Sequence, residues 1–571
     1  MPFTPAVREQ RFVLDHVARI AELAATERFE AATPDLIDAV LEGAGQFAAG
    51  EWAPLNREGD TNGPKWTEQG VKMPAGYAQA YRDYVEGGWG TIGAPADFGG
   101  QGLPFVLASA VLETLGTANM GFALAPTLTV GVIEALLHHG TPEQQAAYLP
   151  HLATGEWTGT MNLTESQAGS DVGALRTRAE PVGDGTFRIS GTKIFISFGD
   201  HDMAENIVHL VLARTPDAPA GTRGISLFLV PKYRLDADGK PGAFNDVRVV
   251  SIEHKMGLHA SPTCVLSFGD NNDCIGELIG PENGGMRAMF TMMNNARLNV
   301  GLQGVQVAEA ATQKAVDFAR DRIQSARAGS ADKSPVAIIE HPDVRRMLMR
   351  MKAQTQAARA LVYLASSMVD RADADEAAKD RLEILTPLAK AHGTDLGNEV
   401  ASLGIQVHGG MGFIEETGAA QFFRDARITP IYEGTNGIQA ADLVGRKLGL
   451  SNGAAFYALI ADMRDDSEDS ALRALIDACD DVGRRLSIAD ADDRLAASYP
   501  FLTMLSVAVC GWLMERQGGI VTESDDDFSR MKRAVAAFYV EQIVPEALGL
   551  HAAATAPAAS VYELPADLFA A

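Results

Sequence analysis

Two changes of hydrophobic period constrain the fold of this chain more than any other feature of its sequence. Up to residue 160 the apolar residues recur at helical spacing, as in VLDHVARIAELAA, and Gly- and Pro-rich loops separate the stretches. Between residues 161 and 281 the runs become short and β-branched, as in TFRISGTKIFISF and GISLFLVPKY, which is typical of strands. Helical spacing returns after GPENGG. Helices and strands segregated in this way predict an α+β fold rather than alternating βαβ units.

The chain of 571 residues is also too long for one hydrophobic core, so we expect several domains. The changes of pattern predict a helical first part, a middle β domain, a C-terminal helical domain and an additional C-terminal helical domain. Within the first part we expect an N-terminal helical extension followed by an N-terminal helical domain. In chain order, the five expected ranges are 1–45, 46–160, 161–283, 284–450 and 451–571. The small and polar segment from Ser325 to Ala337 predicts an exposed loop between two long helices.

The composition narrows the classes of partner. The net charge is −26 and the isoelectric point is near 4.9, which disfavours nucleic acid, because proteins that bind it need a basic surface. The four cysteines form no CxxC pair and no export signal is recognised, so we expect a cytoplasmic protein. The longest apolar run that we identify, residues 501–514, is shorter than the ~20 residues of a membrane span, so none is expected.

A loop at the start of the β region is rich in hydrogen-bond donors. The segment MNLTESQAGSDVGALRTRAE contains Thr164, Gly169 and Ser170, and hydroxyls and backbone N–H groups of this kind can cradle a pyrophosphate. A plain connection between a helix and a strand has the same composition. The residues by themselves leave both interpretations open.

The strand that follows this loop, TKIFISF, places Lys193, Phe195 and Ser197 on one face by alternation. An aromatic ring beside a hydroxyl can flank a flat ligand. An inward phenylalanine, however, more often belongs to the hydrophobic core. The strand is therefore a candidate for ligand binding only together with other motifs.

Isolated cations and histidines give weaker indications. Arg297 and Arg322 fit surface ion pairs, which are the commoner case for such residues. His254 and His408 each lack a second ligand at metal spacing, so we expect no metal site. The glycines of HGGMGF follow a helix instead of a strand, so a Rossmann dinucleotide site is not expected.

One acid, Glu433 in IYEGTNGIQ, lies between an aromatic residue and a Gly-Thr turn. Its immediate neighbours do not distinguish a solvated loop carboxylate from a general base. More distant motifs are needed to decide.

Those motifs are LTESQAGSDV, GTKIFIS, MNNARLNVG, QVHGGMGF and FRDARITPIYEGTNGIQ, which in this order resemble the acyl-CoA dehydrogenase family. The resemblance runs from Trp52 to Leu450. It implies a helical N-terminal domain, a β-barrel-like middle domain and a C-terminal four-helix bundle, with FAD between the last two. The implied reaction is α,β-dehydrogenation of an acyl-CoA thioester to the trans-2-enoyl-CoA, as in fatty acid β-oxidation. Electrons are expected to pass to an electron-transfer flavoprotein.

The resemblance assigns cofactor contacts to several separate stretches of the chain. Arg322 and the QVHGG residues match contacts made to the FAD of a neighbouring subunit, while Glu165 is expected to be structural. The implied FAD contacts are Leu163, Thr164, Gly169, Ser170, Phe195, Ser197, Arg322, Gln406, Gly409, Gly410 and Thr435.

Glu433 falls at the family position of the catalytic base, which removes the α-proton while the β-hydrogen leaves as hydride to flavin N5. A free glutamate, with a pKa of about 4.3, is a weak base for such a proton, so burial beside an acyl chain is expected to raise its pKa. The implied hydrogen bonds to the thioester carbonyl come from the Glu433 backbone N–H and a ribityl hydroxyl. The alternative base position of the family holds Ala296, and Arg297 beside it is expected to support the base loop.

The sequence also differs from the family pattern at several positions. Gly437 and Pro342 stand where glutamine is common among relatives, which affects the inter-subunit FAD contacts. The loop of residues 325–337 and the residues after Leu450 exceed the ordinary family length. This layout resembles an enlarged bacterial subgroup that includes 3-methylmercaptopropionyl-CoA dehydrogenase and broad-specificity fatty acyl-CoA dehydrogenases. A homodimer is favoured, because the added domain can occupy the surface that tetramers use.

Two alternatives share the expected fold. An acyl-CoA oxidase has the same base but gives its electrons to oxygen. A non-catalytic scaffold can dispense with the base, so the presence of Glu433 weighs against it. Fatty, thioether, branched, aromatic and steroid side-chain acyl groups all remain open, because the sequence does not place the side chains of the acyl pocket.

Overall fold

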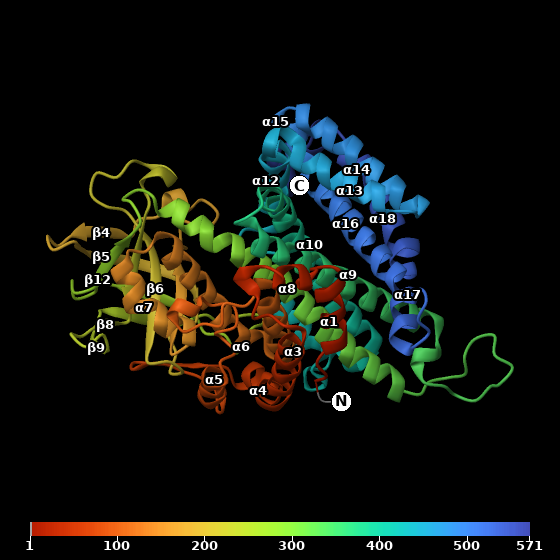
Figure 1. Cartoon of the computed structure of the whole chain (residues 1–571), viewed down its shortest axis with the longest axis horizontal. Coiled ribbons are helices and arrows are strands. Elements are labelled where there is room, and N and C mark those ends of the chain that lie inside the picture. The colour runs from red at the N-terminus through yellow and green to blue at the C-terminus, as the bar shows by residue number, and fades with distance from the viewer. Residues whose placement is uncertain (1–2, 571) are drawn as a thin grey trace. The chain divides into compact units, whose positions relative to one another are not determined.

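The computed structural model describes residues 3–570, apart from the side chains of residues 292 and 294. These residues form two compact units, one of residues 27–296 and one of residues 3–26 with 297–570. Helices precede and follow a β-rich segment along the chain, and further helices come after them. The predicted α+β class is therefore confirmed (Figure 1).

The first unit begins with helices that are well marked in the sequence. Thr33 and Thr141 each accept a hydrogen bond at a helix start that also carries a proline, and Thr141 forms a capping box with Gln144. The helices of this part are α3 (Pro34–Phe47), α4 (Ala53–Asn62), α5 (Tyr77–Glu86), α6 (Phe105–His139) and α7 (Pro142–Thr154).

Helix α6 is the most apolar of these elements. Among the described residues it is the one helix long and apolar enough to cross a membrane, with a mean hydropathy of 1.7 over its best window. The sequence analysis identified residues 501–514 as the longest apolar run and so missed this helix. Of that window, 72% is buried, and α6 packs on α3, α4, α7 and β3. An all-round apolar surface is what a helix in the centre of a domain requires.

The β region forms one curled sheet and two small ribbons. The strand order is β10-β11-β5-β12-β7-β6-β3, with β4 paired to β5, and only the β3–β6 pair is parallel. The strands are β3 (Trp157–Asn162), β4 (Arg178–Pro181), β5 (Thr186–Ser197), β6 (Asn206–Ala213), β7 (Ser226–Pro231), β10 (Val247–Ile252), β11 (Thr263–Phe268) and β12 (Ile275–Ile279). The ribbons are β1 (Lys65–Thr67) with β2 (Gly70–Lys72) and β8 (Tyr233–Leu235) with β9 (Pro241–Phe244).

Apolar clusters fill both faces of this sheet. On one face, Leu136 of α6 and Leu149 of α7 pack with Leu210 and Leu229 of the sheet. On the other, residues such as Ile189, Phe228 and Phe268 pack against one another within the curl. Strands β6 and β7 are buried along their whole length, because both of their faces are covered.

The second unit is helical throughout. Helices α1 (Val7–His16) and α2 (Ile20–Ala24) pack on α9, and the loop predicted at residues 325–337 connects α8 to α9. The main helices are α8 (Gly285–Asp321), which enters this unit at residue 297, α9 (Pro342–Ala372), α10 (Glu376–His408), α11 (Ala419–Ala426) and α12 (Asn436–Gly445).

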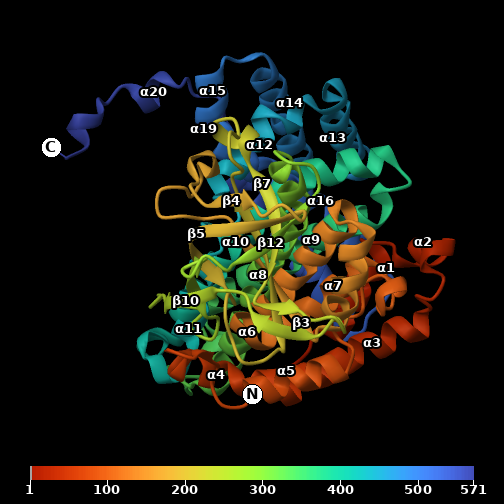
Figure 2. The same ribbon diagram turned by 90° about the vertical axis from the view of Figure 1, so that its left-hand side faces the viewer.

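The residues after Leu450 form further helices around one apolar helix, α16. Residues 501–514 of α16 are almost all buried, because α16 packs on α9, α10 and α12 as well as on α14 and α17. The helices are α13 (Ala454–Asp466), α14 (Ser470–Ile488), α15 (Ala491–Ala496), α16 (Ser498–Ile520), α17 (Asp527–Phe538), α18 (Val544–Leu548), α19 (His551–Ala554) and α20 (Ala559–Tyr562). In Figure 2 the segment that contains α20 leads away from these helices.

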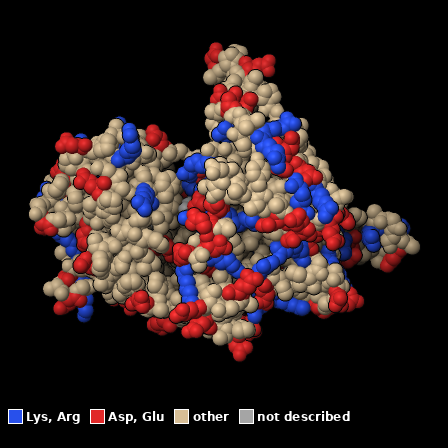
Figure 3. Space-filling view, turned by 45° about the horizontal axis from the view of Figure 1, so that its top comes forward, with Lys and Arg blue, Asp and Glu red and all other residues tan. Residues whose placement is uncertain are grey.

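The surface carries both signs of charge. The face seen in Figure 3 has broad uncharged areas and other areas where acidic and basic side chains lie close together, and acids predominate in the chain overall. Part of the acidic loop sequence has a structural role, since Asp469 and Asp526 cap helices α14 and α17.

The backbones of α8 and α10 approach each other closely, because glycines line their crossing. A Cβ atom on Gly304 would lie 1.9 Å from the carbonyl oxygen of Gly393, and one on Gly301 would lie 2.5 Å from that of Ala389. Gly397 faces Gly304 in the same way, with its Cβ position 2.8 Å from the Gly304 backbone. No side chain of any other type fits between the two helices at these points.

Replacing Gly304 with alanine is therefore expected to destabilise the protein. Overpacking against a backbone carbonyl costs about 2 kcal/mol or more, so thermal unfolding of Gly304→Ala should begin at a clearly lower temperature than that of the unmodified protein. The control is Gly519→Ala in α16, where nothing lies within 4 Å of the added methyl group. There alanine is expected to be neutral or slightly stabilising. Equal melting temperatures for the two variants would contradict the proposed crossing.

Candidate active site

Glu433 lies in the loop that joins α11 to α12 and has a left-handed backbone, with φ of +55°. This conformation is unfavourable for a residue with a side chain and typically costs about 1–3 kcal/mol. It persists only where the surrounding structure determines it. The loop is accordingly anchored on both sides of the acid.

One anchor precedes Glu433 and the other follows it. The Tyr432 hydroxyl donates a hydrogen bond to the side chain of Gln303 in α8. After the acid, the Asn436 backbone N–H donates to the carbonyl of Pro430 over 3.0 Å and closes the loop. The Asn436 side chain accepts a hydrogen bond from Lys390 Nζ in α10 over 2.8 Å. Both long helices thus hold the segment that carries the acid.

The charge of Glu433 is set by two opposing effects. Desolvation by burial raises the pKa of its carboxyl, and the nearby charges of Arg297 and Lys390 lower it. Burial is the larger effect, so the pKa lies above its ordinary value. Burial likewise lowers the pKa of Lys390 to about 8, against the attraction of Asp395 and Glu433. The acid is half-buried and lies beside two buried cations.

Arg297 is buried, so the surface ion pair that the sequence favoured for it is wrong. Its guanidinium lies 3.8 Å from Asp442 of α12, and both side chains are only 6% exposed. Arg297 Nε and Gln439 Oε1 are buried and have no hydrogen-bond partner among the described residues. Because buried polar groups are normally satisfied, these atoms mark a place where a ligand or water would bind.

Thr435 has a structural role in the described chain. Its hydroxyl oxygen accepts a hydrogen bond from the backbone N–H of Ile438 over 3.2 Å and caps the start of α12. The hydroxyl hydrogen is not used in this bond. Its predicted contact with FAD stays a prediction.

The loop of residues 163–170 is fixed to strand β5 within the first unit. Ile194 N–H donates to the carbonyl of Thr164 over 2.9 Å, and Lys193 Nζ donates to that of Leu163 over 3.0 Å. Gly169 and Ser170 are exposed, and nothing lies within 4 Å of the position that a Cβ on Gly169 would occupy. The backbone here is open to a ligand.

The buried carboxylate of Glu165 stabilises this loop through an ion pair and several hydrogen bonds. Its carboxylate lies 2.9 Å from the Lys193 ammonium and accepts hydrogen bonds from Arg176 N and from both the backbone N–H and the hydroxyl of Thr177. Although burial acts in the opposite direction, the charge of Lys193 and these bonds lower the pKa of Glu165 to about 2. Burial lowers the pKa of Lys193 to about 8. The pair fits the structural role expected for Glu165.

The expectation that Lys193, Phe195 and Ser197 share one face is wrong. Lys193 is fully buried, whereas Phe195 is 59% exposed and Ser197 is half-buried. The pairing of β5 with β11 shifts register in this stretch, and Phe195 has a left-handed φ of +61°. The irregularity turns the aromatic ring out of the core, which the alternation pattern could not indicate.

Arg322, Gln406, Gly409 and Gly410 gather at the far end of α8 and α10. All four are exposed, and the stacking of Phe318 on His408, with ring centroids 4.4 Å apart, joins the two helix ends. Arg322 follows Arg297 by 25 residues, so a continuous helix separates them by ~37 Å. These residues and Glu433 therefore belong to different ends of the helical unit.

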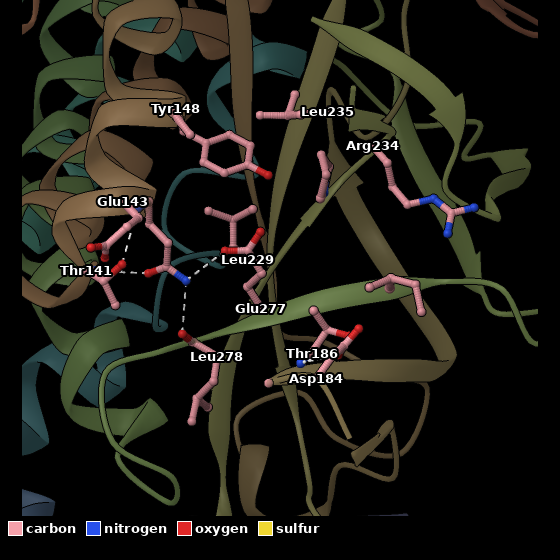
Figure 4. Close-up of a pocket in the computed structure, with 15 residues that line it drawn as sticks. Thr141, Glu143, Tyr148, Asp184, Thr186, Leu229, Arg234, Leu235, Glu277 and Leu278 are labelled. Carbon is pink, nitrogen blue, oxygen red and sulfur yellow. Dashed lines mark hydrogen bonds between the residues drawn. The ribbon is translucent and has the colours of Figure 1, made fainter. Parts of the chain in front are cut away.

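A surface pocket of about 820 Å³ lies elsewhere, between α7 and the sheet (Figure 4). Gln144 donates hydrogen bonds there to Glu277 and to the carbonyl of Leu278, and the Tyr148 side chain points toward the same space. None of the predicted site residues lines this pocket. In the described part of the chain, no group of three or more His, Cys, Asp or Glu residues could hold a metal ion.

Sequence reasoning missed several residues around Glu433. Lys390, Asn436, Asp395 and Asp442 come from α10 and α12, and their proximity depends on how these helices pack. The one local signal was Lys390 itself, a cation within the apolar run ILTPLAKA. A lysine in such a run needs a buried partner.

Four family models match the chain in sequence. They describe the acyl-CoA dehydrogenase N-terminal domain (residues 35–156), middle domain (160–271) and C-terminal domain (283–448), and an acetyl-CoA dehydrogenase C-terminal-like domain (459–565).

Relatives match over nearly the whole length. The chain is 43% identical to 3-methylmercaptopropionyl-CoA dehydrogenase of Ruegeria pomeroyi, over 97% of this chain and 98% of that protein. It is 32% identical to the broad-specificity linear acyl-CoA dehydrogenase FadE5 of Mycobacterium tuberculosis, over 94% and 95%. The fold is that of an acyl-CoA dehydrogenase from Bacillus anthracis solved in complex with FAD, with a TM-score of 0.73 and 21% identity over 95% of this chain and 91% of that one.

The Glu165–Lys193 pair gives the site a testable dependence on pH. A carboxyl whose pKa is lowered on folding contributes stability that is present above its unfolded pKa of 4.5 and is lost as the pH falls toward its folded value of about 2. Glu165→Gln leaves Lys193 buried without its counter-charge, so the melting temperature should fall at pH 7. It should also decrease less steeply than that of the unmodified protein between pH 5 and pH 3. Parallel curves in differential scanning calorimetry would refute this.

Proposed function

Because the chain belongs to the acyl-CoA dehydrogenase family, an FAD-dependent family of oxidoreductases, we propose that it converts an acyl-CoA thioester to the trans-2-enoyl-CoA with Glu433 as the base. The environment of Glu433 carries this proposal. A general base works best when its pKa lies near the operating pH, and desolvation moves the pKa of Glu433 in that direction.

The neighbours of Glu433 suit removal of an α-proton. Arg297 and Lys390 attract the carboxylate and keep its ionised form available, while burial keeps it basic. Ala296, at the alternative base position, offers no competing carboxyl group. The strained backbone of Glu433 holds the acid in one place, which supports a positioned base over a solvated loop acid.

The loop of residues 163–170 and strand β5 suit FAD. The exposed Phe195 ring and the Ser197 hydroxyl offer a surface for a flat ring system, and the open backbone at Gly169 and Ser170 offers N–H donors to phosphate oxygens. Leu163, Thr164 and Thr435 complete the proposed contacts. When bound, FAD accepts the hydride that leaves the β-carbon of the substrate.

The remaining proposed contacts imply a second subunit. Arg322, Gln406, Gly409 and Gly410 are exposed and lie ~37 Å along α8 from Arg297, which is too far for both groups to serve the same end of one cofactor. We propose that they contact the FAD of a partner in a homodimer.

We propose the substrate and the electron acceptor from the similarity of the chain to known acyl-CoA dehydrogenases. The 43% identical relative is a 3-methylmercaptopropionyl-CoA dehydrogenase, so this thioester and linear fatty acyl-CoA are the first candidates. An electron-transfer flavoprotein in the cytoplasm is the proposed electron acceptor.

The proposed domain boundaries near residues 160, 283 and 450 are supported by the ends of the matched family models.

Glu433→Gln tests the base. Glutamine keeps the shape of the side chain but cannot take up a proton, so anaerobic reduction of the bound flavin by acyl-CoA should slow at least about a hundredfold while FAD content is unchanged. The control is Glu416→Gln, an exposed acid in the same unit, which should reduce its flavin normally. Rapid flavin bleaching in Glu433→Gln would exclude Glu433 as the base.

The pH dependence of the unmodified protein gives a second test of the base. Its kcat should fall as the pH drops through the raised pKa of Glu433, because the protonated form is inactive.

A panel of acyl-CoA thioesters tests the reaction itself. Under anaerobic conditions, at least one thioether or linear acyl-CoA should bleach the flavin and yield the 2-enoyl-CoA, measured by absorbance and mass spectrometry. Under air without another acceptor, little peroxide is expected. Stoichiometric peroxide would instead identify an oxidase, and no turnover across the panel would identify a scaffold.

A further inference from the structure

A hydroxyl from the C-terminal extension, residues 451–571, reaches the network that anchors the base loop. Tyr499, the second residue of α16, donates a hydrogen bond of 2.6 Å to Asp395 Oδ2 in α10. The other oxygen of Asp395 accepts a bond of 2.8 Å from the Asn436 side chain. One carboxylate thus bridges the extension and the first residue of α12.

Asn436 connects Asp395 to the base loop through its hydrogen bonds. It is 3% exposed, and the two hydrogens of its amide group are shared among Asp395, Thr394 Oγ1 and the carbonyl of Ala391, while its oxygen accepts from Lys390. Its backbone N–H closes the loop that contains Glu433. Because polar partners surround both ends of this buried amide group, its position is fixed, and so is the end of the loop that follows Glu433.

The extension presents Tyr499 on a rigid element. Residues 501–514 of α16 are almost all buried, and α16 packs directly on α9, α10 and α12. Further along the extension, Lys532 is buried and bonds to Glu9 over 2.9 Å and to Gln517 over 2.7 Å. The first turn of α16 therefore cannot shift without disrupting a large apolar contact.

We propose that the C-terminal extension is a working part of the catalytic site, in which Tyr499 acts as a positioning residue for Glu433 through Asp395 and Asn436. This inference rests on the proposed role of Glu433 as the base. It gives the extension a function in the reaction, beyond covering the surface of the helical unit.

The charges of Asp395 and Lys390 predict the sign of the change in the pKa of Glu433 when the Tyr499 hydroxyl is removed. The hydrogen bond from Tyr499 favours ionised Asp395, whose pKa is otherwise raised by burial. Ionised Asp395 favours the charged form of Lys390, and that charge lowers the pKa of Glu433. Arg297 from α8 acts on Glu433 in the same sense, and Arg427 acts on Asp395, but neither bonds to Tyr499. Loss of the hydroxyl should therefore raise the pKa of Glu433.

Tyr499→Phe tests the proposal in the full-length, FAD-loaded protein. We expect kcat to fall about tenfold with KM within about twofold, the effect of one charge-assisted hydrogen bond on the position of a catalytic group. The acidic limb of the kcat–pH profile should move to higher pH. The matched control is Tyr562→Phe, which removes the same hydroxyl from a residue of the extension that is 66% exposed. It should leave kcat and the pH profile unchanged.

Asp395→Asn gives an independent measurement of the same route. It keeps the shape of the side chain and removes its charge, so it should shift the acidic limb in the same direction. The double variant should be no slower than Asp395→Asn alone, because both changes interrupt one route. FAD content and melting temperature, measured on all variants, separate positioning from folding.

The outcomes are distinct from those that test the base. If the unmodified protein and Tyr562→Phe bleach their flavin and Tyr499→Phe matches them in kcat and pH profile, the positioning role is overturned while the base assignment stands. A loss of kcat in Tyr499→Phe that only parallels loss of FAD or of thermal stability would also overturn it. Failure of the unmodified protein to reduce its flavin would instead overturn the proposed function.

Discussion

The close crossing of α8 and α10 is the contact on which the helical unit depends. Gly301 and Gly304 face Gly393 and Gly397, and the absence of side chains lets the two backbones touch. The crossing fixes how far along its axis each helix lies relative to the other. Arg297 lies one turn before Gly301, and Lys390 lies just before Gly393, so the same contact that packs the unit also brings two cations to Glu433.

The site concentrates features that are unfavourable for stability. Glu433 has a left-handed backbone, Arg297 and Lys390 are buried cations, and Arg297 Nε and Gln439 Oε1 are buried without a hydrogen-bond partner in the part of the chain that the structure describes. Other parts of the chain include capped helices and the Glu165–Lys193 pair, in which the buried charges are satisfied. Backbone strain, buried charge and unpaired polar atoms that surround a single acid are typical of a functional site.

Much of the fold was predictable because it depends on local patterns. The two changes of hydrophobic period marked the helical and β regions, and the motifs identified the family that the comparisons then confirmed. The face of Phe195 was not predictable, because a register shift with β11 reverses the alternation of β5. The burial of Arg297 was missed for a similar reason, since its partner Asp442 lies 145 residues away in sequence.

The sequence by itself determined the succession of helical and β regions, the family and the cofactor, and it pointed to Glu433 as the proposed base. It did so because period, turn residues and motif order are properties of short segments. Only the tertiary structure decided the environment of that acid. The pKa of Glu433 depends on burial and on charges from α8 and α10, and the hydrogen bonds from Tyr499 to Asp395 and from Asn436 to Asp395 join distant parts of the chain at the end of its loop. Electrostatic and hydrogen-bond energies depend on distances in space, and packing sets these distances.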